Sequence, residues 1–287
     1  MTTQSVSTFV AVDRFYDVRG VRLHTIQWGD RTSSPVAIML HGVGGNAQSF
    51  NTLGPRLAAA GMRAIAMDQR GSGSSSSPET GYGIDDCAED IEAICEVEKL
   101  SSVVLVGHSR GGWQAAYLAG RRPDLVSKVV LIDPARIGFA SEADADAFYA
   151  GVRAMFGPFS SLDEAIEAGR ERDPAVRWTP EREASFLAGL TTREDGSVVA
   201  RTSLDVLAQL RAARGDGDHV REVVSSVTAP TLMFVSAKAA PSRQDQKMEY
   251  ARLIPDVRVE RVDATHAIHQ DEPDVVASTI LDFLASA

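Results

Sequence analysis

Residues 103–113 read Val103-Val104-Leu105-Val106-Gly107-His108-Ser109-Arg110-Gly111-Gly112-Trp113. Four apolar residues of high strand propensity lead into Gly-His-Ser-Arg-Gly, and an alanine-rich helical pattern follows at once. The order predicts a strand, a sharp turn with Ser109 at its apex, and a helix. Such a turn holds a serine hydroxyl clear of the sheet and directs the next backbone N–H groups towards the same point. Gly107 and Gly111 suit this turn, because side chains there would collide where strand and helix pack closely.

The same alternation of strand and helix extends along the chain on both sides of this turn. A hairpin is expected over residues 13–29, and further strands, most of them apolar and buried, over residues 36–40, 63–67, 103–106, 128–132, 231–236 and 257–262. Helical patterns separate most of these strands, for example over residues 49–60 and 84–99. The sequence therefore predicts an α/β fold with a doubly wound, mostly parallel, eight-stranded sheet.

An inserted segment interrupts this alternation. Residues 136–218 carry helical patterns but contribute no strand to the predicted sheet. We expect them to form a helical cap on a core made of residues 13–135 and 219–287, above the edge where such sheets bind ligands. Aromatic residues are frequent in the segment. As residues lining a substrate pocket we predict Phe139, Tyr149, Phe156 and Trp178, together with Trp113 beside the serine turn.

Composition narrows the class of protein. The chain has 287 residues and a net charge of −10, without a basic stripe, which argues against nucleic acid or an anionic membrane as partner. Cys87 and Cys95 are eight residues apart in one predicted helix, roughly 12 Å, too far for a disulfide. No signal-peptide pattern or membrane-spanning run is present. We expect a cytoplasmic protein that acts on a small molecule without cofactor or metal, and the sequence leaves a homodimer open.

A nucleophilic serine needs a histidine base, and the chain offers six histidines. His266 follows the last predicted strand and a small-residue turn, and loops after parallel strands share one sheet edge, so it is the expected base. His41 and His108 are expected to support their loops, and His269 to be a structural loop residue. His24 is expected on the exposed face of a strand, and His219 in a linker after the cap.

In their order along the chain, these motifs resemble the α/β-hydrolase superfamily. They are His41-Gly42-x-Gly44-Gly45, Asp68-x-Arg70-Gly71-x-Gly73-x-Ser75, Gly107-x-Ser109-x-Gly111-Gly112, and His266 with a downstream Glu272-Pro273. The resemblance implies Ser109 as nucleophile, His266 as general base, and an oxyanion hole formed by the backbone N–H groups of Val43 and Arg110. A serine at this position differs from epoxide hydrolases and haloalkane dehalogenases, which resemble this pattern but place an aspartate there.

A catalytic triad also needs an acid that orients the histidine, and the position of this acid departs from the common pattern. The superfamily usually carries an aspartate a few residues after the strand that here spans residues 231–236, and this chain has Ala239 there. We favour Asp133, directly after the preceding strand, because the loops after both strands neighbour His266. Asp245 is the main alternative, followed by Asp256 and Asp263.

The leading hypothesis is a serine hydrolase that cleaves a carboxylic ester or lactone of a medium-sized, largely apolar substrate through an acyl-enzyme. The same groups serve amide or C–C bond hydrolysis, since a triad does not determine the substrate. Cofactor-free dioxygenation by a related fold is a second class, and a non-catalytic ligand receptor is a third.

Overall fold

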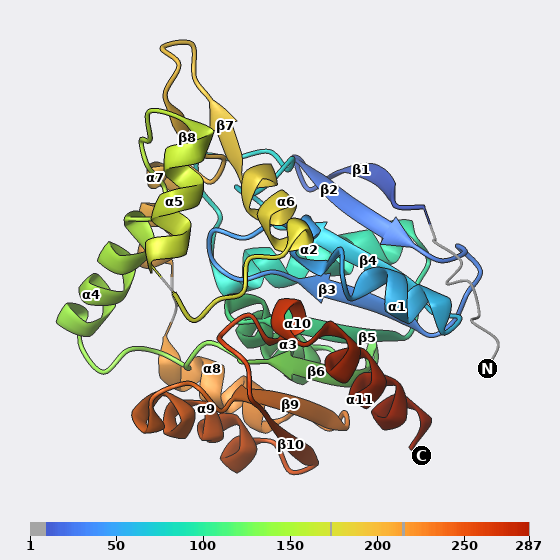
Figure 1. Ribbon diagram of the computed structural model, residues 1–287. Coiled ribbons are helices and arrows are strands. Elements are labelled where there is room, and N and C mark those ends of the chain that lie inside the picture. The colour runs from blue at the N-terminus through green and yellow to red at the C-terminus, as the bar shows by residue number, and fades with distance from the viewer. Residues whose placement is uncertain (1–9, 173, 214–215, 287) are drawn as a thin grey trace, which may run out of the picture.

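A computed structural model describes residues 10–172, 174–213 and 216–286 of the chain. Its centre is an eight-stranded sheet in the order β1-β2-β4-β3-β5-β6-β9-β10 (Figure 1). β1 and β2 form an antiparallel hairpin, β2 pairs antiparallel with β4, and all later pairings are parallel. The predicted fold class is confirmed. The strands are β1 (Val12–Val18), β2 (Val21–Trp28), β3 (Val36–Leu40), β4 (Arg63–Asp68), β5 (Val103–His108), β6 (Val126–Ile132), β9 (Thr231–Ser236) and β10 (Val257–Val262).

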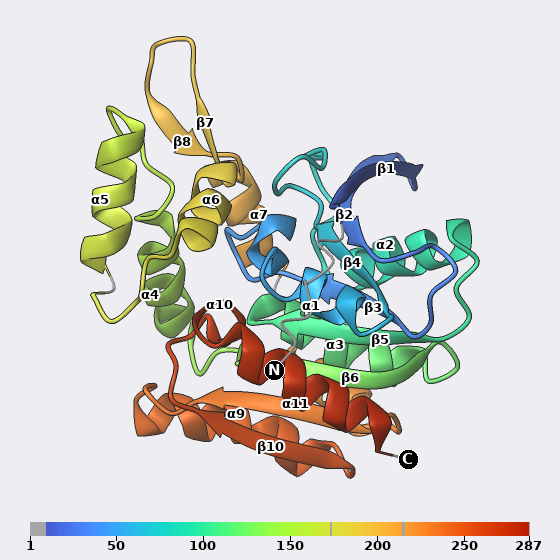
Figure 2. The ribbon, with the colours of Figure 1, turned by 45° about the vertical axis from the view of Figure 1, so that its right-hand side comes forward.

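Helices cover both faces of the sheet, which explains why its central strands are apolar throughout (Figure 2). Alternate residues of one strand enter two different cores: Ile38 and Leu40 of β3 pack on one side, Ala37 and Met39 on the other. One side is covered by α2 (Ile84–Val97), α3 (Arg110–Arg121), α8 (Gly217–Ser225) and α9 (Pro241–Leu253). The other is covered by η1 (Ala47–Phe50), α1 (Gly54–Ala59), α10 (Ile268–Asp271) and α11 (Pro273–Ala285).

The single helix expected over residues 49–60 is wrong. The chain forms the 3-10 helix η1, capped by the Asn46 side chain, which accepts from Gln48 N at 2.9 Å. A separate helix, α1, then begins at Gly54. Pro55 lies in the first turn of α1, where its missing N–H costs nothing, whereas inside one long helix it would break the hydrogen-bond ladder.

The segment between β6 and β9 forms α4 (Glu142–Arg153), α5 (Leu162–Arg172), α6 (Pro180–Ala188) and α7 (Leu204–Ala212). It also contains an antiparallel hairpin that the helical reading of this segment did not anticipate, β7 (Leu190–Thr192) with β8 (Val198–Ala200). Figures 1 and 2 show these elements together at one side of the sheet. The predicted boundary between cap and core, at residues 218 and 219, falls in the first turn of α8. Val220 and Val224 of this helix belong to the hydrophobic core on one face of the sheet.

Two histidines do not lie where the sequence suggested. His219 is part of α8, not of a linker, and its ring meets the hydroxyl of Tyr117 at 3.2 Å. His24 is buried, because β2 lies inside the sheet between β1 and β4. Its Nδ1 meets Asp68 Oδ2 at 2.7 Å, and its Nε2 meets Asp13 Oδ1 at 2.8 Å. In the described part of the chain, every helix is too short or too polar to cross a membrane.

Candidate active site

The turn at Ser109 has the backbone that its sequence predicts. Ser109 lies between β5 and α3 with φ 52° and ψ −116°, a region that residues with a Cβ rarely adopt. A Cβ on Gly107 would lie 2.2 Å from the carbonyl oxygen of Gly111, and one on Gly111 would lie 2.1 Å from that of Leu40. Only glycine permits this close approach of helix and strands. Close packing of the residues on both sides of Ser109 therefore maintains its strained backbone conformation.

Asp133 and His266 are joined at the same sheet edge. Asp133 follows β6, is fully buried, and its Oδ2 meets His266 Nδ1 at 2.5 Å. Its Oδ1 accepts from the backbone N–H of Ser236 at 2.9 Å, and its own N–H donates to Phe234 at 2.9 Å. Burial works against the charge of Asp133, but the hydrogen bond to His266 and the nearby cation of Lys247 hold its pKa below the ordinary value.

Lys247 is a member of this cluster that the sequence reasoning missed. It is buried in α9, and its Nζ forms an ion pair with the same Oδ2 of Asp133 that meets His266. Its place in the sequence carries one signal: it lies three residues before the buried Tyr250, on the same face of the helix. A buried lysine is rarely tolerated without a partner. A lysine on that face indicates a buried acid opposite it.

The other candidate acids lie away from His266. Asp245 is exposed on α9, where its partner is Arg252 at 3.8 Å. Asp263 is exposed and 4.0 Å from Lys238, and the backbone carbonyl of Asp256 pairs with the start of β9. Ala239 stands in the turn after β9 and donates its N–H to the hydroxyl of Ser236. Of the four acids considered from sequence, the structure brings only Asp133 to the histidine.

His108 places the His266 loop beside the serine turn. Its Nε2 meets the carbonyl oxygen of His266 at 3.0 Å, and the two rings lie 4.7 Å apart. Burial, helped by the neighbouring rings of His266 and His269, holds the pKa of His108 well below its ordinary value, so the ring is neutral. Within the described part of the chain the Ser109 hydroxyl has no hydrogen bond. Contacts of catalytic groups often tighten only when substrate binds.

The glycine-rich loop after β3 lies directly over the serine. A Cβ on Gly42 would be 3.0 Å from the Cβ of Ser109. Arg110 is the first residue of α3, so its N–H has no carbonyl partner inside the helix. The backbone N–H groups of Val43 and Arg110 are thus carried by the two segments that meet at Ser109. Their hydrogen bonding to an oxyanion stays a prediction.

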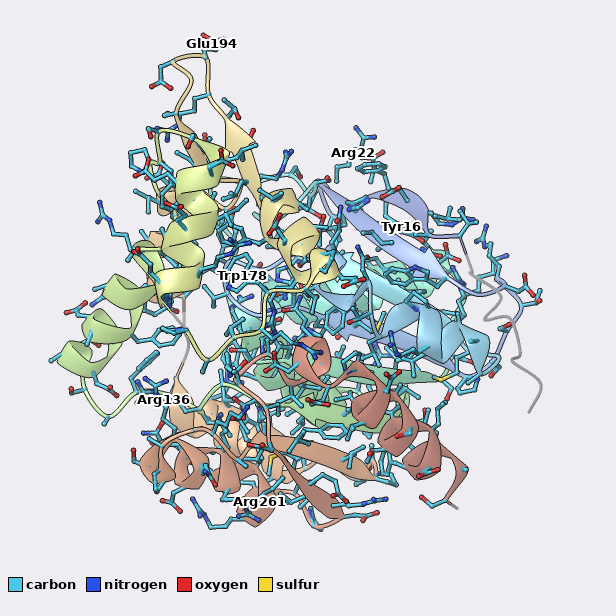
Figure 3. The ribbon with its side chains drawn as sticks, viewed as in Figure 1. Tyr16, Arg22, Arg136, Trp178, Glu194 and Arg261 are labelled. Atoms are coloured by element: carbon cyan, nitrogen blue, oxygen red, sulfur yellow. The ribbon has the colours of Figure 1, made fainter. Side chains whose placement is uncertain are left out.

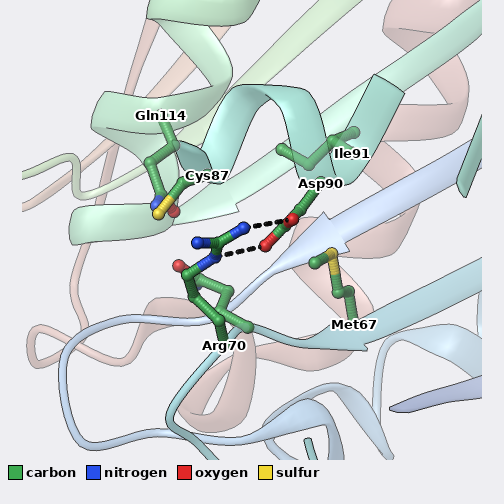
Figure 4. A pocket seen from close by; sticks show the side chains of 7 residues that line it. Met67, Arg70, Cys87, Asp90, Ile91 and Gln114 are labelled. Carbon is green, nitrogen blue, oxygen red and sulfur yellow. Dashed lines mark hydrogen bonds and ion pairs between the residues drawn. The ribbon is translucent and has the colours of Figure 1, made fainter. Parts of the chain in front are cut away.

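The Asp68-to-Ser75 motif forms hydrogen bonds to both of these segments. Gln69 donates its N–H to His41 Nε2 at 3.1 Å and its side-chain amide to the His41 carbonyl at 2.6 Å, and it accepts from Arg110 Nη1 at 2.7 Å. Arg70 forms a bidentate ion pair with the buried Asp90, with Nε 2.6 Å from Oδ2 and Nη2 2.5 Å from Oδ1 (Figure 4). The gap beside this pair has no room for a water molecule. The motif therefore supports the serine turn.

The inserted segment also reaches the His266 loop. Arg182 of α6 is buried and forms an ion pair with Asp271 Oδ1 at 2.9 Å. Asp271 Oδ2 in turn accepts from the N–H and hydroxyl of Thr265, at 2.7 and 2.5 Å. Arg182 Nη2 also lies 3.5 Å from the carbonyl oxygen of Ala267. A side chain of the insertion therefore contacts the loop directly after His266, at Ala267 and Asp271.

A cavity of 360 Å³ lies between the insertion and the sheet edge, beside the serine turn. Its wall includes Val43, His108 and Ala267, which flank the candidate triad, and the predicted pocket residues Phe156 and Trp178. Figure 3 labels Trp178 where the insertion meets the core. Lining residues that the sequence did not single out include Met155, Phe159, Arg172, Arg182, Phe186 and His269.

Three predicted pocket residues are not on this wall. Trp113 is buried in the core beneath α3, where it packs with the sheet. Phe139 and Tyr149 pack against Phe148 in tilted and edge-on ring contacts within the insertion, and the Tyr149 hydroxyl donates to the Leu210 carbonyl at 3.2 Å. Aromatic content alone does not separate residues that stabilise the insertion from residues that face the cavity.

A metal-binding cluster of three or more His, Cys, Asp or Glu side chains is not found within residues 10–172, 174–213 and 216–286. His266 and His269, the pair that a His-x-x-His site would use, have different environments. His269 is buried between Phe50 and His108, at ring distances of 4.9 and 4.7 Å. Burial lowers the pKa of His269 to about 3, whereas the His266 side chain is half exposed.

Comparison with known proteins agrees with this geometry. The family model of the alpha/beta hydrolase fold matches residues 35–273. A 2-(acetamidomethylene)succinate hydrolase of Mesorhizobium japonicum is 30% identical over 280 residues, which cover 96% of this chain and 97% of that protein. The sn-1-specific diacylglycerol lipase ABHD11 of Mus musculus is 29% identical over 265 residues, 90% of this chain and 83% of that one. The crystal structure of E-2-(acetamidomethylene)succinate hydrolase matches with a TM-score of 0.81 at 26% identity, covering 96% of this chain and 100% of the other.

Proposed function

Because this chain is an enzyme of the α/β-hydrolase fold family, we propose that it is a serine hydrolase that cleaves a carboxylic ester or lactone through an acyl-enzyme. The observation that carries this proposal is the contact of the buried Asp133 with His266 Nδ1, beside a serine held in a strained turn. That contact leaves the other ring nitrogen, Nε2, for the serine hydroxyl, as a nucleophilic serine requires.

In the proposed mechanism, His266 Nε2 takes the proton of Ser109 as its Oγ attacks the carbonyl carbon. The carbonyl oxygen becomes an oxyanion, which the N–H groups of Val43 and Arg110 stabilise. His266 then gives the proton to the departing alkoxide oxygen, and the acyl group stays on Ser109. A water molecule, deprotonated by His266, releases the acid and restores the serine. Asp133 holds the imidazole in the required tautomer and stabilises its positive charge.

The size and lining of the cavity support a medium-sized, largely apolar substrate. A volume of 360 Å³ is near the lower end for small-molecule sites. Most of its wall is apolar, with Met155, Phe156, Phe159 and Phe186 on the side of the insertion.

The test is labelling and turnover with a matched pair of serine variants. A fluorophosphonate probe should label the wild-type protein and the Ser74→Ala variant, since Ser74 is an exposed serine of the neighbouring loop. The Ser109→Ala variant should take no label and hydrolyse no 4-nitrophenyl ester or lactone above background. Labelling of Ser109→Ala at the wild-type rate would overturn the assignment of the nucleophile.

Amide hydrolysis is a second candidate, favoured by the likeness to a 2-(acetamidomethylene)succinate hydrolase over nearly the whole chain. The same assay with matched ester and anilide substrates distinguishes the two, by whichever has the higher kcat/KM. Turnover of a β-diketone instead would indicate C–C bond hydrolysis. Consumption of O₂ without hydrolysis would indicate the cofactor-free dioxygenase that the sequence also left open.

A further inference from the structure

The buried side of α6 in the insertion is polar. Every residue of this helix is described, and its two buried side chains are Arg182 and Ser185, with exposed fractions of 7% and 6%. The two residues are three positions apart, so they face the same side of the helix. A helix that only covered an apolar cavity would bury apolar side chains on that side. A buried arginine is rare unless it is paired, so the partners of this face indicate what α6 does.

Arg182 holds the loop that carries His266. Its Nη1 lies 2.9 Å from Asp271 Oδ1, and its Nη2 lies 3.5 Å from the carbonyl oxygen of Ala267. The other carboxylate oxygen of Asp271 accepts from the N–H and the hydroxyl of Thr265, at 2.7 and 2.5 Å. Thr265 and Ala267 are the two neighbours of His266 in the chain. Arg182 therefore restrains one neighbour directly and the other through Asp271.

The same face of α6 holds the glycine-rich loop after β3. The side-chain amide of Asn46 donates to the carbonyl oxygen of Ser185 at 3.0 Å, and both residues are buried. Asn46 directly follows the glycines of this loop, and its side-chain oxygen caps η1. The N–H of Val43, which is proposed for the oxyanion hole, belongs to the same loop. One helix of the insertion thus contacts both segments that must be aligned around Ser109.

The position of His266 depends on such side-chain contacts. Residues 263–267 belong to no helix or strand, so no ladder of backbone hydrogen bonds holds them. The core contacts His266 at its ring, through Asp133, and at its carbonyl oxygen, through His108. The ring itself is half exposed. Contacts to the backbone beside it therefore have a large share in fixing where the ring lies.

We propose that Arg182 is a positioning residue, which together with Asp271 sets the His266 ring relative to the oxyanion loop. This inference rests on the proposed serine hydrolysis. A guanidinium suits the task, because its planar fork can donate to a carboxylate and to carbonyl oxygens at the same time. Arg182 Nη1 also donates to the carbonyl oxygen of Arg177 at 3.2 Å, which fixes the side chain from within the insertion. The insertion then aligns the catalytic groups in addition to forming the cavity wall.

The experiment measures hydrolysis of 4-nitrophenyl acetate by wild type and three variants. Arg182→Gln should lower kcat by about 10–100-fold with KM within about threefold, because a displaced His266 slows the reaction more than it weakens binding. Arg182→Lys should recover most of this loss, since an ammonium can still pair with Asp271. Glu183→Gln is the matched control: it removes the adjacent ion pair of α6, with Arg170 at 3.0 Å, and should leave kcat unchanged.

Two further variants test the partners of α6 and keep the proposal testable if Arg182→Gln does not fold. Asp271→Asn should lower kcat as Arg182→Gln does, and the double variant should be no slower than either single one. Asn46→Ser keeps a good cap for η1 but removes the amide donor to Ser185, and it should lower kcat about threefold or more. Unchanged kcat in Arg182→Gln and Asp271→Asn, with lower stability only, would overturn the inference.

Two measurements without substrate separate this inference from the proposed function. Hydrogen exchange of the Thr265 amide should be about tenfold faster in Arg182→Gln than in wild type, because its acceptor Asp271 is no longer held. The Nδ1–H signal of His266 in a ¹⁵N-histidine spectrum should shift or broaden in the same variant. If no ester is hydrolysed, the ester hydrolase proposal fails, but both changes should still occur. An unchanged amide and ring signal contradicts the positioning role whatever the reaction is.

Discussion

The loops after β6 and β9 lie side by side but have opposite electrostatic roles. The β6 loop carries the buried carboxylate of Asp133. The β9 loop carries no acid at Ala239 and supplies only donors: the N–H of Ser236 from its strand, and the ammonium of Lys247 from the following helix. Because β6 and β9 are adjacent, with Ile132 paired to Phe234, a carboxylate on either strand end can reach the same histidine.

In the proposed triad, the acid comes from the strand next to the one that usually carries it. The histidine needs a buried, ionised carboxylate at its Nδ1. Either strand end can supply this carboxylate. The neighbouring strand end then has to satisfy the carboxylate's second oxygen and its charge. Here the two functions are divided: the acid follows β6, its hydrogen-bond donor is at the end of β9, and its cation is in α9.

The largest effect is expected from removing the acid itself. Asp133→Asn should lower kcat by about 10³–10⁴-fold, because an amide neither stabilises the imidazolium nor holds the required tautomer. The control is Asp245→Asn on the β9 side, which should retain activity within about twofold, as expected of an exposed site. Steady-state kinetics on one ester decides the comparison. Normal turnover of Asp133→Asn with loss in Asp245→Asn would assign the acid to the other loop.

The second prediction concerns the stability of the same pair. In Asp133→Asn, Lys247 is left buried without its counter-charge, and we expect a loss of about 3 kcal/mol in the free energy of unfolding at pH 7. Adding Lys247→Met should restore much of this loss without restoring activity. The pKa of Asp133 is lowered in the folded state, so its contribution is present above the unfolded value of about 3.9 and is lost as the pH falls below it.

Urea unfolding of wild type, both single variants and the double variant at pH 7 and pH 3 measures this. The difference between wild type and Asp133→Asn should shrink at the lower pH. Additive single effects in the double variant would contradict a direct ion pair.

The third prediction tests the cation alone. Lys247→Met removes a positive charge from the carboxylate that faces His266, so protonation of the imidazole becomes easier. The acid limb of kcat/KM should move to higher pH by about one unit, while Lys247→Arg should keep it in place. Asp133, Lys247, His108 and His269 are the titratable groups that face this ring. A pH profile that does not move, with lower stability only, would make Lys247 purely structural.

The smallest effect is expected at Ser236. Its hydroxyl donates to the Ala264 carbonyl at 2.7 Å and accepts from Ala239, whereas its contact with Asp133 uses the backbone N–H. Ser236→Ala should therefore cost about 1 kcal/mol of stability and change kcat only a few-fold. Ser278→Ala, an exposed serine of α11, is the control for thermal unfolding. A loss of activity as large as that of Asp133→Asn would mean that the hydroxyl, not the backbone, positions the acid.

Local pattern predicted the sheet and the serine turn well because their causes are local. Apolar runs such as residues 36–40 and 231–236 need two covered faces, and Gly107 and Gly111 are required by contacts within one strand–turn–helix unit. His24 was misplaced because alternation within β2 does not reveal that β1 and β4 flank it. Trp113 was misplaced because an aromatic residue next to the serine can point to either side of α3.

By itself, the sequence determined the fold class and the strained serine turn, since each follows from residue types in consecutive positions. Only the tertiary structure placed Asp133 against His266 with Lys247 on the same oxygen, and separated the cavity's Trp178 and Phe156 from Phe139 and Tyr149. These contacts join residues more than 100 positions apart, Asp133 to His266 and to Lys247. Their partners are set by which strand ends meet at one edge, and no local spacing encodes that.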